Sequence, residues 1–399
     1  MNKDLIELAK RLIAVPGYAE LEEKETKTAQ ALHQELCGMG LPAELTDHDG
    51  RYNVSCEYRG KLPGPAVVLC THLDTVPPYE MPEAFRGSIE DGKLYGRGAV
   101  DVRGILAAMS MVMKQLFAEQ PKICGSVRFL AVSDEESGSY GMRQELKRGY
   151  AADLTIVGEP TDLQIGAAHK GVAWLQVDFR GKAAHGSVPE EGHNAVYDGT
   201  RFVHTLIHEV IPELKQNRVH PLLGAASVNV GRMDGGTRPT IVPELCRIQL
   251  DRRLVPGEDA ARAMEEIRAA AHKANRGAAD FETEILLGDE SRPFPPLDST
   301  PHAEVLQCLE EALAEVTGSR KPCIGLPFWT DAALPAYFTG KPAVVIGPGN
   351  IAQAHSNHEY VEIRQLEDSV KVYYAMVTSK AVRDALNQEV RKEGRHEIK

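Results

Sequence analysis

The chain has 399 residues, of which 43% are hydrophobic and 26% are charged, as expected for a globular protein of two or three domains. Its 45 basic and 57 acidic side chains give a net charge of -12, which argues against nucleic acid or anionic membrane as partner, because both require a basic face. The sequence has no apolar run of the ~18 residues that a membrane span needs and no signal-peptide core. Its seven cysteines are scattered and form no CxxC pair, so the sequence predicts a cytoplasmic protein with reduced thiols.

The predicted elements begin with two helices, at residues 5–13 and 22–38, where apolar residues recur at helical spacing. A third helix is expected at 104–120. Several short β-rich runs each end in a polar or ionisable residue: 66–74, 127–136, 154–159 and 343–349. This alternation predicts an α/β sheet covered on both faces, with a site at the carboxyl ends of its strands.

The middle of the chain follows a different order. Strands and helices are expected in the order βαββαβ, which is ferredoxin-like, at 173–181, 193–214, 226–233, 245–253, 257–276 and 281–287. The first pattern resumes after the proline-rich segment 292–296. We therefore expect a discontinuous α/β domain, formed by 1–172 and 289–399, interrupted by a smaller domain at 173–288.

Ionisable residues gather at the predicted strand ends. His72 and Asp74 point to the same side of an extended chain, which suits a ligand histidine held by a carboxylate. Asp101 precedes the third helix, and the other candidates are Glu135, Glu136, Glu159 and His355. Imidazole and carboxylate ligands together suit Zn²⁺, Mn²⁺ or Co²⁺. Five ligands are too many for one zinc ion, whereas a carboxylate that bridges two ions would fit.

Each of these residues also has a simpler interpretation. A single histidine after a strand is more often a structural hydrogen bonder, and an adjacent Glu-Glu pair is usually a solvated surface. The segment 96-GRG-98 begins like a dinucleotide-binding loop, but Asp101 stands where its last glycine is needed. The chain has no GxSxG motif, which disfavours a serine hydrolase. The joint placement at strand ends favours a site.

Five segments, in this order along the chain, resemble the signatures of the M20 family of metallohydrolases: 71-THLDTVPP-78, 95-YGRGAVDVRGILAA-108, 134-DEESGS-139, 157-VGEPT-161 and 354-AHSNHEYV-361. The resemblance covers roughly residues 5–385. This family includes acetylornithine deacetylase, succinyl-diaminopimelate desuccinylase, aminoacylase and glutamate-releasing carboxypeptidases. It implies a mixed-sheet metallohydrolase catalytic domain with an inserted ferredoxin-like lid and dimerisation domain.

The resemblance also implies roles for the strand-end residues. Two divalent ions are expected per chain, most commonly zinc, with cobalt or manganese as alternatives. The implied roles are His72 and Glu159 on one ion, Asp101 as the bridge, Glu136 and His355 on the second ion, Glu135 as general base, and Asp74 as the partner of His72. The peptide after the bridging aspartate, Asp101–Val102, is expected to be cis.

The lid segments carry further implied roles. His185, in 181-GKAAHGSVPEEGHNA-195, resembles a histidine that reaches the active site of the partner subunit and stabilises the oxyanion. Arg253 resembles the arginine that binds the substrate carboxylate, for which a planar guanidinium is well suited. Thr240 stands at a substrate-contact position where many relatives have asparagine. Outside this context His185 would be a surface histidine and Arg253 a strand-edge ion pair.

The expected function is hydrolysis of the amide bond of an N-acyl amino acid by a homodimer. Glu159 favours this interpretation, because the deacylases resemble this chain at that position whereas dipeptidases and carboxypeptidases commonly have aspartate. A dipeptidase or carboxypeptidase that releases a C-terminal amino acid is the main alternative. A non-catalytic binding protein is disfavoured because every metal and base position holds a chemically competent residue.

Overall fold

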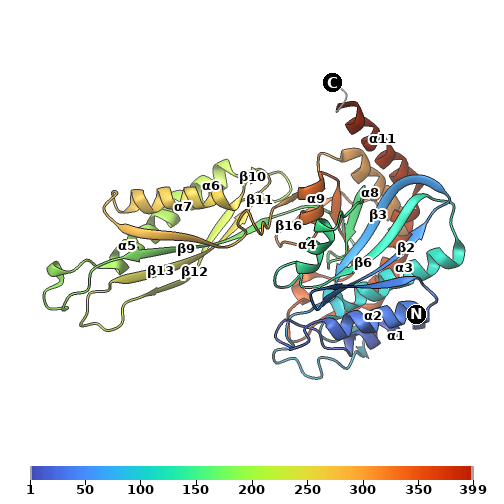
Figure 1. Ribbon diagram of the computed structural model, residues 1–399, viewed down its shortest axis with the longest axis horizontal. Coiled ribbons are helices and arrows are strands. Elements are labelled where there is room, and N and C mark those ends of the chain that lie inside the picture. Colours follow the sequence, from blue (N-terminus) through green and yellow to red (C-terminus); the bar gives the residue numbers. More distant parts are fainter. Residues whose placement is uncertain (1, 397–399) are drawn as a thin grey trace. The chain divides into compact units, whose positions relative to one another are not determined.

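The structure is a computed structural model that describes residues 2–396 (Figure 1). The chain forms two compact units. The first comprises the chain up to Ala167, Ser299–Ile324, and the chain from Thr330 onward. The second comprises Ala168–Asp298 and Gly325–Trp329. Among the described residues no helix is both long enough and apolar enough to cross a membrane.

The large sheet is mixed, with strand order β1-β2-β6-β3-β7-β17-β8-β15, and β16 pairs with β8. Its strands are β1 (Ala43–His48), β2 (Arg51–Arg59), β3 (Leu62–His72), β6 (Cys124–Val132), β7 (Leu154–Val157), β8 (Gly166–His169), β15 (Leu297–Asp298), β16 (Ile324–Leu326) and β17 (Ala343–Val345). Strand β3 is parallel to β6 and β7, and β7 is parallel to β17. The four apolar runs predicted as strands are these parallel neighbours, so the predicted mixed-sheet fold class is confirmed.

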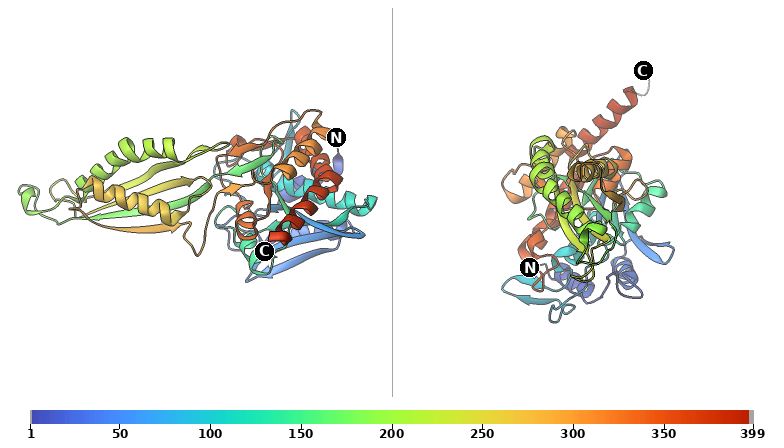
Figure 2. Two further views of the ribbon diagram at one scale, coloured as in Figure 1. Left: turned by 90° about the horizontal axis from the view of Figure 1, so that it is seen from above. Right: turned by 90° about the vertical axis from the view of Figure 1, so that its left-hand side faces the viewer.

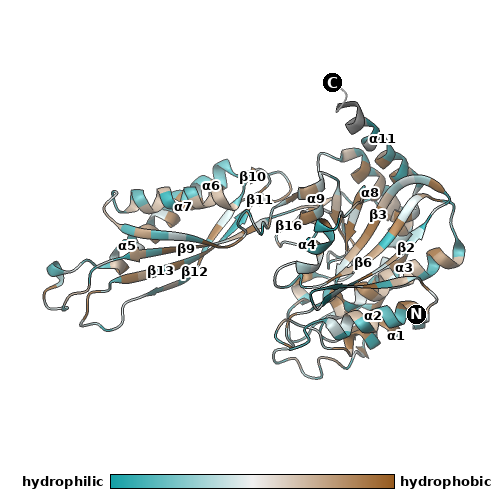
Figure 3. Cartoon of the chain, viewed as in Figure 1, coloured by the Kyte–Doolittle hydropathy of each residue, from teal (hydrophilic) through white to brown (hydrophobic). Residues whose placement is uncertain are grey.

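Helices surround this sheet, and a small sheet of order β18-β5-β4 completes the unit. The elements are α1 (Lys3–Ile13), α2 (Thr26–Gly38), α3 (Gly104–Glu119), α4 (Tyr140–Lys147), α8 (Ala303–Thr317), α9 (Ala333–Thr339), α10 (Ile363–Thr378), α11 (Lys380–His396), the π-helical turn η1 (Ala99–Arg103), the 3-10 turn η4 (Ile351–Gln353), β4 (Ser88–Glu90), β5 (Lys93–Tyr95) and β18 (Tyr360–Glu362). Helix α3 packs against α1, α10 and the sheet, and Figure 3 shows its hydrophobic character.

One predicted helix boundary is wrong. Helix α2 begins at Thr26 rather than at residue 22, because Lys24 has a left-handed backbone (φ 49°) that interrupts a right-handed helix. The neighbouring Glu25 is fully buried and accepts two hydrogen bonds from Arg51 of β2, at 2.8 and 2.7 Å. This buried ion pair holds the start of α2 against β2.

The second unit contains an antiparallel sheet of order β12-β13-β9-β14, which confirms the predicted ferredoxin-like domain. Helices α5 and α7 pack against each other and against β9 (Figures 1 and 2). The elements are β9 (Gly171–Arg180), the 3-10 turn η2 (Pro189–Glu191), α5 (Ala195–Thr205), the π-helical turn η3 (Leu206–Val210), α6 (Ile211–Asn217), β10 (Val219–His220), β11 (Gly224–Ala225), β12 (Ser227–Gly235), β13 (Leu245–Leu254), α7 (Ala260–Ala274) and β14 (Asp280–Leu287).

The core of this unit follows from alternation along β9. Ala173, Leu175, Val177 and Phe179 are buried in one cluster with residues of the helices, as expected for side chains two positions apart on a strand. The predicted helix at 193–214 is real but interrupted by η3. Pro212 explains the interruption, because proline lacks the N–H that a regular helix would use. The β10–β11 hairpin was not predicted.

Candidate metal centre

Three adjacent strands of the large sheet deliver ionisable residues to one edge. His72 is the last residue of β3, Glu135 and Glu136 follow β6, and Glu159 follows β7. Because β6, β3 and β7 are parallel neighbours, their carboxyl ends meet at the same edge of the sheet. Asp101 lies in η1, which leads into α3, and His355 lies in the loop before β18.

Asp101 lies between the two histidines. Its Oδ1 is 3.1 Å from Nε2 of His72, and its Oδ2 is 3.2 Å from Nε2 of His355. Each histidine also faces a glutamate: Oε1 of Glu159 lies 3.6 Å from His72, and Oε1 of Glu136 lies 3.2 Å from His355. Ligand atoms of His72, Asp101 and Glu136 all lie within 4.8 Å of one another. The arrangement is two His-Glu pairs that share one aspartate.

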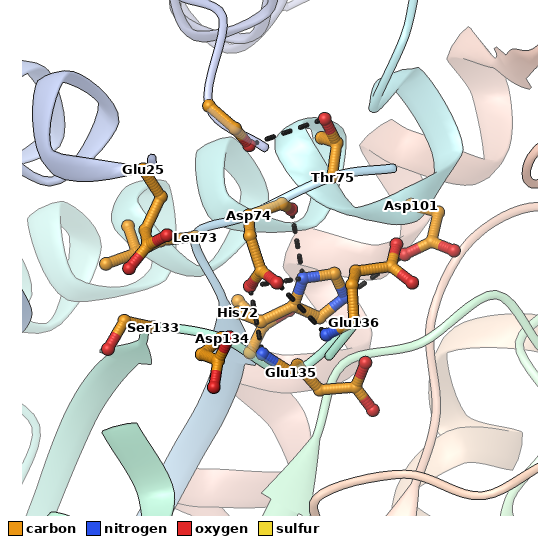
Figure 4. Close-up of polar contacts among 12 residues, drawn as sticks. Glu25, His72, Leu73, Asp74, Thr75, Asp101, Ser133, Asp134, Glu135 and Glu136 are labelled. Carbon is orange, nitrogen blue, oxygen red and sulfur yellow. Dashed lines mark hydrogen bonds and ion pairs between the residues drawn. The ribbon is translucent and has the colours of Figure 1, made fainter. Parts of the chain in front are cut away.

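Asp74 orients the residues around it (Figure 4). Its carboxylate accepts the backbone N–H groups of Glu135 at 3.1 Å and of Glu136 at 3.0 Å. Its backbone oxygen lies 3.1 Å from Nδ1 of His72, which leaves Nε2 of that ring facing Asp101. Burial alone would raise the pKa of Asp74, but the hydrogen bonds from His72 and from these N–H groups lower it. Asp74 therefore remains an anion whose carboxylate fixes the glutamate turn and lies 3.5 Å from Nδ1 of His72, while its backbone oxygen holds the imidazole.

The centre is rich in buried negative charge. Burial, reinforced by neighbouring carboxylates, raises the pKa of Glu135 and of Glu159 well above the usual range. Hydrogen bonds to Asp101 and Glu136 raise the pKa of His355 to about 11. Burial would lower the pKa of His72, but its hydrogen bonds to Asp101 and Asp74 raise it well above its ordinary value. Positive charge is therefore strongly favoured here.

The residues fit divalent metal ions. Oε1 of Glu159 is a buried oxygen without a hydrogen-bond partner among the described residues. A buried, unpartnered carboxylate oxygen is costly unless a cation or proton satisfies it. The donor set of imidazole nitrogens and carboxylate oxygens is the set that zinc, cobalt and manganese accept. The Asp101–Val102 peptide is cis, as the resemblance implied.

Some buried residues around the centre were missed by the sequence analysis. Glu359 accepts the backbone N–H of Asp101 at 3.1 Å and pairs with Arg97 at 2.6 Å. The buried guanidinium of Arg103 donates to the backbone oxygen of Leu73 and to Oγ1 of Thr28, and burial lowers its pKa to about 10. Arg97, Arg103 and Glu359 lie within motif segments, but charge alone does not distinguish a buried residue from a surface one.

The predicted lid residues lie in the second unit, at two ends of its sheet. His185 pairs with Ile241, and Gly186 N donates to the backbone oxygen of Thr240 at 2.7 Å, so His185 and Thr240 lie close together. Nδ1 of His185 lies 2.7 Å from Oγ of Ser187.

Arg253 lies at the other end of the sheet, where it pairs with Val172 of β9 and its Nε donates to Asp251 at 3.0 Å. Strand β13 starts at Leu245, paired with Arg180, so at about 3.3 Å per residue Arg253 lies roughly 25 Å or more from the Thr240 loop.

Histidines and carboxylates gather at the carboxyl ends of parallel strands in a mixed sheet, and a ferredoxin-like unit follows in the same chain. This combination places the protein in the class of metal-dependent hydrolases. Within that class the chain belongs to peptidase family M20/M25/M40, whose profile matches residues 68–379. This confirms the resemblance drawn from the motifs. Members of the family are hydrolases of amide or peptide bonds, and one solved structure, YXEP of Bacillus subtilis, is named a dinuclear metal-binding peptidase of family M20.

Similar proteins with different activities are found. Acetylornithine deacetylase of Myxococcus xanthus is 32% identical over 305 residues, which cover 75% of this chain and 76% of that protein. A probable carboxypeptidase of Aspergillus terreus is 27% identical over 341 residues, covering 82% and 74%. Among solved structures, aminopeptidase PepT of Bacillus cereus aligns with a TM-score of 0.76 at 20% identity, covering 94% of this chain and 98% of that chain. This last likeness establishes the fold.

Proposed function

We propose that this protein is a metal-dependent deacylase that hydrolyses the amide bond of an N-acyl amino acid. The observation that carries the proposal is Asp101, whose two carboxylate oxygens each face a histidine that is itself paired with a glutamate. The deacylase branch is supported by the 32% identity to an acetylornithine deacetylase and by glutamate at position 159.

The metal assignment follows the two His-Glu pairs. His72 and Glu159 would hold one ion, His355 and Glu136 the other, and Asp101 would contact both. We propose zinc, although cobalt or manganese suits the same donors. Bound divalent ions supply a water of lowered pKa and polarise the scissile carbonyl.

Glu135 is proposed as the general base. Its backbone N–H is fixed by Asp74 at 3.1 Å, and burial raises the pKa of its carboxyl well above the usual range. A carboxylate with a raised pKa accepts a proton from the attacking water more readily. It then delivers that proton to the leaving amine, and the products are the free carboxylate of the acyl group and the amino acid.

Substrate recognition is assigned to Arg253, Thr240 and His185. Arg253 would bind the substrate carboxylate, whereas His185 and Thr240 lie at the opposite end of the same sheet. One second unit therefore cannot bring both ends to one small substrate. We propose a homodimer through this unit, in which His185 of the partner subunit stabilises the oxyanion. Strand β12, an edge strand of the sheet, carries exposed Met233 and offers a surface for such association.

The alternative function is release of a C-terminal amino acid by a dipeptidase or carboxypeptidase. It is favoured by the 27% identity to a probable carboxypeptidase, and it uses the same metals and base. The two functions differ in their products: a deacylase releases a carboxylic acid and one amino acid, whereas a dipeptidase releases two amino acids. We propose the cytoplasm as the compartment because the seven cysteines form no CxxC pair and are odd in number.

The test is amine release from N-acetyl, N-succinyl and N-formyl amino acids and from simple dipeptides, with and without a chelator. Chelator-sensitive cleavage of one N-acyl class supports the deacylase, and the same assay with the Glu135→Gln variant controls for contaminating activity. Cleavage of dipeptides alone would replace the deacylase with the alternative. Absence of cleavage with zinc, cobalt and manganese supplied would contradict both functions.

A further inference from the structure

Glu359 is a fully buried carboxylate that contacts the backbone beside the metal centre. Its Oε1 accepts the N–H groups of Val100 at 3.0 Å and of Asp101 at 3.1 Å. Its Oε2 lies 2.6 Å from Nη1 of Arg97, and both side chains of this ion pair are only 1% exposed. None of these contacts involves an atom that we assign as a metal ligand.

The Arg97–Glu359 pair joins three segments of the chain. Glu359 lies four residues after His355, and its backbone oxygen accepts the N–H of Gly96 at 3.2 Å. Its side chain binds the start of η1, which carries Asp101. Nε of Arg97 donates to the backbone oxygen of Pro77 at 3.1 Å, in the loop that follows Asp74. The pair thus connects the His355 loop, the Asp101 turn and the loop after β3.

The chemistry of these contacts is specific to a carboxylate. The turn η1 is kinked at Asp101 and Val102, whose backbone angles are not helical, and a buried backbone N–H that has no partner within its own segment requires an outside acceptor. Glu359 supplies it with one oxygen and neutralises Arg97 with the other. A glutamine has the same shape but only one acceptor oxygen, and its amide group would place N–H donors against the guanidinium.

We propose that Glu359 is a positioning residue for Asp101, which fixes that carboxylate relative to His355 and thereby sets the affinity of the ion held by His355 and Glu136. The inference rests on the two-metal site of the proposed function. His72 and Glu159 follow strands β3 and β7 and do not depend on Glu359 for their position. Loss of the Arg97–Glu359 pair would disturb only the shared Asp101 at the ion of His72 and Glu159, but both Asp101 and the His355 loop at the ion of His355 and Glu136. We therefore expect the ion of His355 and Glu136 to be weakened far more than the other.

The chain offers a matched control in the second unit. Oε1 of Glu258 lies 2.6 Å from Nη2 of Arg252, and its Oε2 accepts the backbone N–H of Val255 at 2.9 Å. Like Arg97–Glu359, this buried pair joins a guanidinium to a carboxylate that also accepts a backbone N–H. Arg218 lies 3.6 Å from Glu258 and Glu266 lies 3.3 Å from Arg252, and none of the proposed metal ligands is bonded to the pair. Glu258→Gln should therefore lower the melting temperature without a selective effect on metal binding.

The experiment titrates chelator-treated full-length protein with Co²⁺, by calorimetry and by visible absorption, for the wild type, Glu359→Gln and Glu258→Gln. For Glu359→Gln we expect one of two binding steps to weaken by about 10–100-fold, the usual effect of losing a residue that orients ligands, while the other step changes little. Thermal unfolding of the metal-free proteins reports the general loss of stability. Arg97→Lys keeps the positive charge but loses the hydrogen bond to the backbone oxygen of Pro77. This variant should weaken the same binding step by a smaller factor.

Three outcomes would contradict the inference. The first is that both Co²⁺ affinities of Glu359→Gln lie within threefold of the wild-type values. The second is that both affinities of this variant weaken equally. The third is that Glu258→Gln shows the same selective loss of one Co²⁺ affinity. If Glu359→Gln does not fold, the Arg97→Lys isotherm decides between the same outcomes. A wild-type protein that binds fewer than two ions would instead contradict the proposed function, so the two failures are distinguishable.

Discussion

Asp74 provides the sharpest test of how the centre is organised, through the substitution Asp74→Asn. The carboxylate accepts N–H groups from both Glu135 and Glu136, one on each oxygen. Asparagine has one acceptor oxygen, so one of these N–H groups would face the amide NH₂ group. A buried donor left without an acceptor costs about 1–3 kcal/mol. At 1.4 kcal/mol per factor of ten, this corresponds to about 5- to 150-fold in a binding constant.

We expect this free energy to appear as weaker metal binding and slower turnover. The N–H group that loses its acceptor belongs to the turn that carries the proposed base, Glu135, and a proposed ligand, Glu136. The assay compares Zn²⁺ affinity by calorimetry, kcat on the best amide substrate, and thermal unfolding. Because hydrogen bonding lowers the pKa of Asp74, its carboxylate stays ionised at neutral pH. The ratio of wild-type to variant activity should therefore be constant between about pH 6 and 9.

Asp153→Asn is the control for this experiment. Oδ2 of Asp153 accepts the backbone N–H of Ala66 at 2.8 Å, and this contact involves none of the proposed site residues. We expect Asp153→Asn to leave metal affinity and kcat unchanged. The reasoning would be refuted if the metal affinity and kcat of Asp74→Asn stayed within twofold of the wild-type values. It would also be refuted if Asp153→Asn lowered both quantities as much as Asp74→Asn does.

Three further predictions concern the base, the protons and the dimer. Glu135→Gln should keep its metal content but lose about 10²–10⁴-fold in kcat, the usual range for a general base, and retention of near-wild-type turnover would contradict the assignment. The pKa of His355 is raised to about 11 in the absence of metal, so this imidazole is protonated at pH 7.5 and must lose its proton to bind an ion. Zn²⁺ binding should therefore release protons, measured as a binding heat that depends on the ionisation enthalpy of the buffer; a buffer-independent heat would contradict it. Mixing inactive His185→Ala and Glu135→Gln proteins should restore part of the activity through hybrid dimers, and no restoration after subunit exchange would contradict a shared site.

Much of the fold was predictable because its signals are local. The apolar runs that became β3, β6, β7 and β17 are continuous, as parallel buried strands are, and the alternation along β9 marks one buried face. The placement of acids and histidines after those strands follows directly from the parallel order. The hairpin β10–β11 escaped prediction because strands of two residues carry no periodic signal.

The contacts that organise the centre were not predictable in the same way. Arg97 and Glu359 are 262 residues apart in sequence, and neither lies in an apolar pattern that signals burial. The distance between Thr240 and Arg253 was also hidden, because only the pairing register of β13 shows that they lie at opposite ends of one sheet. The assignment of both residues to substrate binding remains a proposal.

The parallel strands beneath the centre have a consequence for its entropy. His72 ends β3, and Glu136 and Glu159 lie only a few residues beyond β6 and β7, so short tethers connect these side chains to the hydrogen-bonded ladder. Most of the conformational freedom of these tethers is already lost when the sheet folds. Binding of an ion then needs little further ordering of the backbone. Preorganisation of this kind would allow changes in the second unit to alter substrate preference while the hydrolytic centre keeps its form.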